Sequence, residues 1–215
     1  YQTDWGSKMN QTAKKSLLFA IALSVLASTY RLVGELTLER SKNLSLATPL
    51  DDAMPIIPEL TVIYMTIYCM WLPLIFSQNI SCAYFKKIIA ATFVAFGILY
   101  IFYFLMPSSY PRPAMTDCNC WRHSPLRFLY DMDLPNNTFP SSHAAGVAIL
   151  LLATFGKFKT AGLIFYQIWG LTIIFSTFAI KQHYILDAAC GAGIGAIVFI
   201  IINKWPRLIS SKNPA

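Results

Sequence analysis

Hydrophobic residues in this chain are gathered into six runs that are separated by polar segments of unequal length. A helix needs roughly 20 apolar residues to cross the hydrocarbon core of a bilayer, and four of the runs approach that length. The first and fourth runs are shorter, so their flanking residues must extend them or reach the interface. The pattern predicts an all-α protein, a six-transmembrane-helix bundle. The six runs are Ser16–Leu32, Ile57–Phe76, Ile88–Met106, His143–Phe155, Ala161–Ile180 and Tyr184–Asn203.

The composition favours a membrane protein over a soluble bundle of buried helices, which is the alternative. The 215 residues are 56% hydrophobic and only 13% charged, with a mean hydropathy of +0.52. That is more apolar than ordinary soluble domains. We expect a single membrane domain over residues 16–205. Residues 1–15 are expected to be a polar N-terminal tail or an interfacial helix, and residues 206–215 a polar C-terminal tail.

The placement of charge predicts how the bundle is oriented. With six helices, both termini and the loops 78–87 and 156–160 share one side. That side holds ten of the 17 Lys and Arg residues but only one acidic residue, Asp4. Positive residues stay cytoplasmic, so the termini are expected inside and the long loops 33–56 and 107–142 outside. We expect an integral protein of a bacterial inner membrane. We expect no nucleic-acid partner, because the lysines are dispersed over helix ends.

The five cysteines give no clear metal motif. Cys118 and Cys120 lie in the second outer loop with His123 nearby, but their spacing differs from that of known zinc sites. A disulfide or redox pair is a second interpretation, and an ordinary loop is the simplest one. No metal and no cofactor is expected.

His183 and Asp187 are the first pair of residues that suggests chemistry. They are four positions apart, so on a helix they would share one face. A carboxylate beside an imidazole fixes its tautomer and leaves the other ring nitrogen free to attack. An acidic residue inside a membrane helix is costly and indicates a functional site. The alternative is a structural pair that caps the helix.

A second histidine, His143, opens the fourth apolar run directly after Pro140, Ser141 and Ser142. Serine hydroxyls and free backbone N–H groups at a helix N-terminus form an anion site. A histidine there can donate a proton to a leaving oxygen. Plain N-capping, with His143 at the interface, is the alternative.

Two cations could complete a phosphate site. Arg112 is fixed between two prolines in the second outer loop, and its planar guanidinium suits bidentate phosphate recognition. Lys181 lies at the mouth of the sixth run and is either a phosphate ligand or an interface anchor. These residues all fall on the predicted outer side, where together they could bind and cleave a phosphate ester.

A glycine-rich segment, Gly191–Gly195, superficially matches a dinucleotide-binding loop. It lies inside an apolar run with no preceding strand, so that interpretation fails. Small residues that let two membrane helices pack closely explain it better.

The order Arg-Pro, then Pro-Ser-x-His, then Ser-x6-His-x3-Asp resembles the phosphatidic acid phosphatase type 2 superfamily. The third motif runs from Ser176 to Asp187, and the resemblance covers roughly residues 50–203. It implies a membrane lipid substrate, an outward-facing site and a phosphohistidine at His183. It also implies that Asp187 orients His183 and that His143 protonates the leaving alcohol. The residues expected to hold phosphate oxygens are Arg112, Ser141 and the backbone of Ser142.

The chain departs from the family pattern at three positions. Leu105 stands where the first motif has lysine, Ser142 where the second has glycine, and Thr177 where the third has arginine. Lys181 is the local substitute for the missing cations. The Lys-Gln-His-Tyr form is similar to the branch of inositol-phosphorylceramide-synthase-like bacterial proteins. A lipid phosphatase is the leading function, with a phosphotransferase or a catalytically silent membrane subunit as alternatives. Protein partners are unknown.

Overall fold

The computed structural model of the chain describes residues 2–43, 46–113 and 123–210. Within these ranges the backbone is helical apart from turns, loops and one isolated bridge between Ser109 and Asn136. The all-α prediction is therefore confirmed. The helices are α1 (Gln2–Thr37), η1 (Arg40–Asn43), α2 (Pro49–Ala53), α3 (Leu60–Met65), η2 (Thr66–Met70), α4 (Trp71–Phe76), α5 (Cys82–Leu105), α6 (Ser124–Met132), α7 (Ser142–Thr154), α8 (Thr160–Ala179) and α9 (Ile185–Ser210).

Four helical stretches are long and apolar enough to cross a membrane. They are Asn10–Thr37, Cys82–Leu105, Thr160–Ala179 and Ile185–Lys204. The two remaining apolar runs form shorter helical stretches, Leu60–Phe76 and Ser142–Thr154. Each predicted run thus coincides with a helical stretch apart from one to three residues at the ends of some runs, and four of the six stretches reach the length of a span.

The second run is not one uniform helix, as its hydrophobicity had suggested, but the succession α3, η2 and α4. Two residues explain the 3-10 segment in the middle. The hydroxyl of Thr66 donates to the carbonyl of Ile63 at 2.6 Å and competes with the helical backbone pattern. Pro73 has no N–H to donate to the carbonyl of Cys69. Both effects are local and tighten the helix without ending it.

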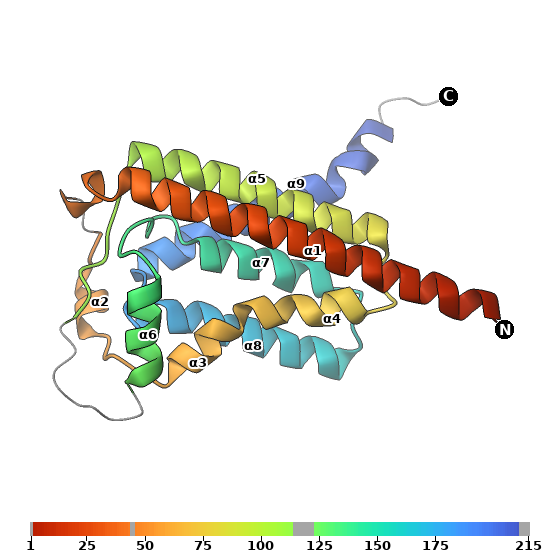
Figure 1. The fold of residues 1–215 in the computed structure, drawn as a ribbon, viewed down its shortest axis with the longest axis horizontal. Helices are drawn as coiled ribbons and strands as arrows, with labels where there is room; N and C mark the ends of the chain where they lie inside the picture. Colours follow the sequence, from red (N-terminus) through yellow and green to blue (C-terminus); the bar gives the residue numbers. More distant parts are fainter. Residues whose placement is uncertain (1, 44–45, 114–122, 211–215) are drawn as a thin grey trace.

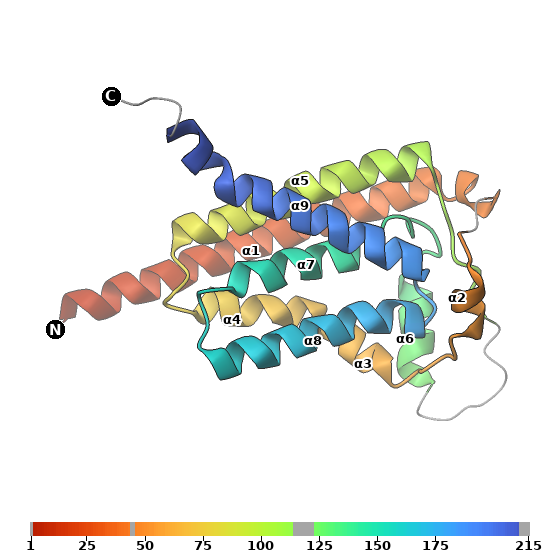
Figure 2. The same ribbon diagram turned by 180° about the vertical axis from the view of Figure 1, so that it is seen from behind.

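Helix α7 lies at the centre of the bundle, where α5, α8 and α9 surround it (Figures 1 and 2). Ten of its 13 residues are buried, whereas large apolar side chains of α1, α5 and α8 are exposed. A helix whose neighbours are protein needs no lipid-matching length, which explains why α7 can be short. Exposed apolar side chains on the outer helices suit contact with lipid.

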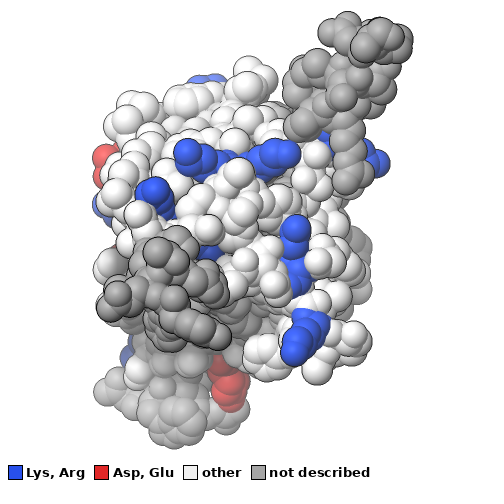
Figure 3. Space-filling model, turned by 90° about the vertical axis from the view of Figure 1, so that its right-hand side faces the viewer, with Lys and Arg blue, Asp and Glu red and all other residues white. Residues whose placement is uncertain are grey.

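The two termini lie at one end of the bundle, and α2 and α6 lie at the other (Figure 1). Lysine and arginine side chains dominate the end that carries the termini (Figure 3). Lys15 is an exception among the lysines expected there, because it is buried. Its ammonium donates to the carbonyls of Leu74, Ser77 and Ile80 at 3.2, 2.9 and 3.2 Å. This lysine therefore caps the carboxyl end of α4.

Over their described residues, 2–15 and 206–210, the expected tails are helical. Residues 2–15 form the first turns of α1 and continue into the apolar part of the same helix without a break. At the other end α9 runs through Ser210, beyond the expected boundary at residue 205. The second outer loop also contains a helix, α6, whose apolar residues predicted no span.

Candidate active site

The site forms where the first turn of α7 packs against α9, and two glycines make that contact possible. A β-carbon at Gly191 would lie 2.1 Å from the carbonyl oxygen of Ser141, and one at Gly195 would lie 2.2 Å from that of Ala145. Any side chain here would separate the two helices. The helix-packing interpretation of the glycine-rich segment is confirmed. The contact is extended by a hydrogen bond from the Ser141 N–H to the carbonyl of Asp187, at 2.9 Å.

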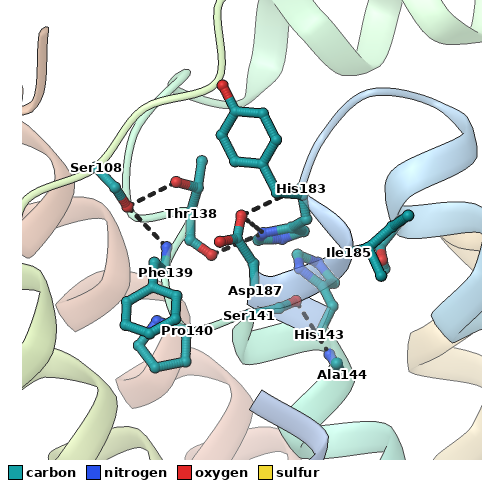
Figure 4. Close-up of polar contacts among 12 residues, drawn as sticks. Ser108, Thr138, Phe139, Pro140, Ser141, His143, Ala144, His183, Ile185 and Asp187 are labelled. Atoms are coloured by element: carbon teal, nitrogen blue, oxygen red, sulfur yellow. Dashed lines mark hydrogen bonds and ion pairs between the residues drawn. The ribbon is translucent and has the colours of Figure 1, made fainter. Parts of the chain in front are cut away.

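His183 is 4% exposed and lies two residues before α9, in the turn that follows α8. Its Nδ1 lies 2.9 Å from the carbonyl oxygen of Thr138 and 3.8 Å from Oδ2 of Asp187 (Figure 4). A carbonyl can only accept, so Nδ1 carries the proton and donates it. The other ring nitrogen, Nε2, then keeps its lone pair, which is the form required of a nucleophile.

The prediction that His183 and Asp187 meet on one helix face is therefore wrong. They do not share a helix face, because His183 precedes the helix. The turn brings them together instead, and the shorter contact of the imidazole is with Thr138. Asp187, with 0% exposure, accepts a hydrogen bond from the backbone N–H of Tyr184 at 2.8 Å and so also caps α9. Asp187 thus lies near His183, as expected, and it also caps the helix, which was the alternative interpretation of the pair.

Thr138 was not foreseen, and its position is secured by Ser108. The two hydroxyls lie 2.7 Å apart, and the Ser108 hydroxyl also accepts from the N–H of Phe139 at 2.9 Å (Figure 4). Two residues after Thr138, the carbonyl of Pro140 accepts a hydrogen bond from the hydroxyl of Tyr103 at 2.9 Å. These contacts fix the segment that aims the Thr138 carbonyl at His183.

His143 is the second residue of α7 and faces His183, with 5.9 Å between the ring centroids (Figure 4). The hydroxyl of Tyr64 lies 2.9 Å from its Nε2 and 3.2 Å from its Nδ1. The two rings also pack, with centroids 4.7 Å apart. Tyr64 was not foreseen either; a hydroxyl-bearing residue within an apolar run is its only sequence signal. One phosphoester could contact both imidazoles.

Ser141 and Ser142 lie where the sequence placed them, at the start of α7. Ser141 is the N-cap, and its hydroxyl oxygen accepts from the N–H of Ala144 at 3.3 Å. Its own hydroxyl proton remains available as a donor. Ser142 is buried and lines the same cavity as His143. The N-capping role and a helix N-terminus suited to an anion are compatible here.

Arg112 lies in the loop between α5 and α6 and contacts Tyr130 of α6. One terminal amino group, Nη1, donates to the carbonyl of Tyr130, and the guanidinium lies 4.6 Å from the centroid of that ring. The other, Nη2, is buried and has no hydrogen-bond partner among the described residues. Burial lowers the pKa of this guanidinium, while Asp133 opposes the shift. Arg112 lines a separate pocket of about 340 Å³ and is not among the residues that line the cavity of His143.

Lys181 has a left-handed backbone, with φ of 58°, and is 8% exposed. Its ammonium donates to the carbonyl of Asp51 at 2.6 Å. The carboxylate of Asp51 in turn accepts from the N–H of Ile185 at 2.8 Å and from that of Thr48 at 2.9 Å. The N-terminal turn of α2 thus clamps both sides of the His183 turn. Lys181 is therefore a buried, partnered cation that keeps further N–H donors.

The contacts of Asp51 with the His183 turn are expected to contribute to the stability of the fold. Burial disfavours its charged form, but hydrogen bonds from Thr48 and Ile185 and the charge of Lys181 prevail and lower its pKa. A lowered pKa means that the charged form stabilises the fold above the ordinary aspartate value of about 3.9, and that this stability is lost as the pH falls through the lowered pKa. Asp51→Asn should therefore melt at a lower temperature than wild type at pH 7. The gap should shrink below about pH 4.

The matched control for this prediction is Asp52→Asn, since Asp52 is the exposed neighbour on the same helix. It should leave the melting temperature unchanged at both pH values. A melting temperature of Asp51→Asn equal to that of wild type at pH 7 would show that the clamp does not stabilise the turn.

A cavity of about 510 Å³ runs from the first turn of α7 between α1, α5 and the α3–α4 stretch. Apolar side chains form most of its wall. His143 and Ser142, from the first turn of α7, are among its polar lining residues. The described residues that line it are Phe19, Ala22, Leu23, Leu26, Ala27, Tyr30, Arg31, Gly34, Tyr64, Met65, Ile67, Tyr68, Trp71, Ile89, Thr92, Phe96, Phe128, Leu129, Met132, Asp133, Leu134, Asn137, Ser142, His143, Gly146 and Leu150.

Within the described ranges, no group of three or more His, Cys, Asp or Glu side chains could hold a metal ion. Cys118 and Cys120, which the sequence analysis considered for a metal or a disulfide, lie outside those ranges. Comparison of the chain with protein-family models, with curated proteins and with solved structures found no match.

Proposed function

We propose that this chain is a membrane phospholipid phosphatase of the phosphatidic acid phosphatase type 2 superfamily, which hydrolyses a lipid phosphate or pyrophosphate. The observation that carries the proposal is the state of His183. Its Nδ1 donates to the Thr138 carbonyl and lies near Asp187, so the neutral ring keeps the lone pair of Nε2, and the ring centroid lies 5.9 Å from that of His143. That is the arrangement a phosphohistidine mechanism requires.

In the first step, Nε2 of His183 attacks phosphorus and the bond from phosphorus to the lipid oxygen breaks. His143 donates its proton to the departing oxygen, which leaves as an alcohol. The positive charge that develops on His183 is stabilised by Asp187 at 3.8 Å. In the second step, water attacks phosphorus and gives its proton to His143. The phosphorus–nitrogen bond breaks, inorganic phosphate leaves, and both histidines return to their starting states.

The phosphate oxygens need donors around them, because charge spreads over them in the transition state. We assign this role to Ser141, Ser142, Arg112 and Lys181. The unpartnered Nη2 of Arg112 supports its assignment, since a buried donor without an acceptor is costly and an oxyanion would satisfy it. Lys181 keeps two N–H donors beyond the one it gives to Asp51.

The apolar cavity supports a lipid as the substrate. It is lined mainly by hydrophobic side chains and also by His143 and Ser142. A hydrocarbon chain could therefore lie in it while the phosphate reaches His143 and the neighbouring ring of His183. A soluble phosphate ester would gain nothing from that wall. We propose six membrane crossings in a bacterial inner membrane, with cytoplasmic termini and the site at the outer face.

The proposal is tested by incubating the purified protein with phosphatidic acid in detergent micelles, without any added alcohol. Release of inorganic phosphate that vanadate inhibits is the expected result. If labelled phosphate appears only on an added lipid or polyol acceptor, the protein is a phosphotransferase. If neither product forms with any lipid phosphate or pyrophosphate, the chain is the non-catalytic membrane subunit.

Vanadate inhibition also separates the two cations. Arg112→Ala should weaken inhibition by about tenfold or more, because it removes the charged Nη2 donor that has no partner within the protein. Lys181→Ala should weaken it too if its remaining donors reach the anion. Arg127→Ala, on the same outer segment, serves as the control and should leave inhibition unchanged. Wild-type vanadate sensitivity in Lys181→Ala would restrict that lysine to its contact with Asp51.

The orientation can be tested with a membrane-impermeant thiol reagent on sealed cells. Lysines in the short loops place Cys82 on the cytoplasmic side, so we expect it to stay unlabelled until the membrane is opened. Cys118 and Cys120 should react from outside, after reduction if they are oxidised. Labelling of Cys82 alone in sealed cells would reverse the orientation and put the site inside.

A further inference from the structure

The two facing histidines differ in the kind of group that each imidazole contacts. His183 contacts two acceptors, the Thr138 carbonyl at 2.9 Å and the Asp187 carboxylate at 3.8 Å. His143 contacts the phenolic hydroxyl of Tyr64, whose oxygen lies 2.9 Å from Nε2 and 3.2 Å from Nδ1. Within the described ranges, both hydrogen-bond contacts of the His143 side chain are with this hydroxyl. A hydroxyl can donate or accept, whereas a carbonyl or an ionised carboxylate only accepts. The two imidazoles therefore hold their protons differently.

This difference matches the different tasks of the two residues. His183 keeps its Nδ1 proton and becomes positive when Nε2 bonds to phosphorus, so a nearby carboxylate suits it. His143 must lose a proton to the departing oxygen and regain one from water in every cycle. A carboxylate partner would hold that proton too firmly, and without any partner an imidazolium among apolar helices would be costly. A neutral hydroxyl lies between these limits, because it accepts from the imidazolium without adding a negative charge.

Packing holds Tyr64 in place for this contact. Its side chain is 3% exposed and lies in an apolar cluster with Leu126 of α6. Its ring also packs on the imidazole of His143, with 4.7 Å between centroids. Two residues further on, the Thr66 hydroxyl accepts from the indole N–H of Trp169 at 2.8 Å, which ties this stretch to α8. The phenolic hydroxyl is thus fixed beside the imidazole by the surrounding helices.

Resting on the proposed phosphatase function, we propose that Tyr64 is a positioning residue for proton transfer: its hydroxyl accepts from one N–H of the His143 imidazolium and leaves the other N–H for the departing oxygen. That second proton moves to the lipid oxygen as the bond from phosphorus breaks, and His143 becomes neutral. In the second step His143 takes a proton from the attacking water, and the same contact with Tyr64 supports the returning charge. Tyr64 itself neither gains nor loses a proton.

The test removes the hydroxyl and keeps the ring, with Tyr64→Phe. It compares octadecyl phosphate, whose departing alkoxide needs a proton, with a nitrophenyl phosphate that carries a dodecyl chain, whose departing phenolate does not. The ratio kcat/KM reports the steps up to formation of the phosphohistidine. For the alkyl ester we expect kcat/KM to fall by about ten- to a hundredfold, as for losing a hydrogen bond to a charged group.

For the aryl ester, kcat/KM of Tyr64→Phe should equal that of wild type, because no proton is needed in the first step. Its kcat and KM should fall together, because hydrolysis of the phosphohistidine still requires His143 to accept a proton from water. A variant that had merely lost part of its folded population would not show this split between the two parameters.

Tyr166→Phe is the matched control. Tyr166 is 2% exposed, its hydroxyl donates to the Met70 carbonyl at 2.7 Å, and it is not among the residues that line the cavity of His143. Both variants lose one buried hydroxyl contact, so both should melt below wild type. Tyr166→Phe should nevertheless leave kcat/KM of both esters unchanged.

An equal loss of kcat/KM for both esters in Tyr64→Phe would overturn the proposal, because the hydroxyl would then support the fold or the cavity instead of proton transfer. Wild-type kcat/KM on the alkyl ester would overturn it as well. If wild type hydrolyses neither ester, the phosphatase function has failed, and the contact is tested by nitrogen NMR of isotope-labelled histidine rings. The signals of His143, assigned with His143→Ala, should then shift in Tyr64→Phe while those of His183 stay, which would keep Tyr64 as the hydrogen-bond partner of His143. Unchanged His143 signals would reject the contact.

Discussion

Replacing His183 with alanine is expected to lower kcat by about 10⁴-fold or more. The reason is that no other described nucleophile has the same support: Nδ1 donates to Thr138, Asp187 lies 3.8 Å away, and the opposite nitrogen is left free. Without the imidazole no phosphoenzyme can form, and water would have to attack the lipid phosphate directly. The measurement is steady-state phosphate release by the purified variant.

The control for this loss is the third histidine of the chain. His123→Ala removes the imidazole of the N-cap residue of α6, which is not among the residues that line the cavity of His143, and should retain wild-type turnover. Both variants should show wild-type thermal unfolding if the defect in His183→Ala is chemical. Phosphate release by His183→Ala at the wild-type rate would exclude the phosphohistidine mechanism.

Gly191→Ala is expected to have the second largest effect, although it lies outside the reacting groups. The added β-carbon would meet the Ser141 carbonyl at 2.1 Å, and backbone cannot yield as a flexible side chain can. Helix α7 must move away from α9, and its first turn carries His143. Overpacking of this kind costs about 1–3 kcal/mol of stability. A displacement of about 1 Å between reacting groups can cost about a hundredfold in rate.

Gly193→Ala makes a sharp comparison, because a β-carbon at Gly193 meets nothing within 4 Å. The same change on the same helix should leave turnover intact and raise stability slightly through better helix propensity. Thermal unfolding and phosphate release of the two variants would be measured side by side. Equal behaviour of Gly191→Ala and Gly193→Ala would mean that close packing of α7 on α9 does not build the site.

The helices were predictable because hydrophobic runs are local. Six runs gave six helical stretches, and the glycine spacing correctly indicated a close helix contact. The interruption at η2 was not predicted, since hydropathy is insensitive to a hydroxyl at Thr66 or a missing N–H at Pro73. The sequence also left open why the fourth run is short. The reason is that α7 is buried among other helices, and this burial is a property of the assembled bundle.

The histidines, serines and Asp187 were predictable as a group because motifs and their spacing can be read from the sequence. The hydrogen-bond partners of these residues were not predictable. Thr138 is 45 residues from His183, Tyr64 is 79 from His143, and Asp51 is 134 from Ile185. Contacts over such separations depend on how the helices pack, and no local pattern encodes them. The error over the shared helix face has the same origin, since the turn at Lys181 delays the start of α9.

The most direct test of the proposed mechanism is to trap the covalent intermediate. The protein would be mixed with a lipid phosphate carrying labelled phosphorus, quenched within milliseconds in alkali, in which a phosphohistidine survives, and digested to locate the label. We expect the label on the peptide that contains His183, and none on His183→Ala. Phosphate release with no protein-bound label, or a label on a peptide without His183, would contradict the mechanism.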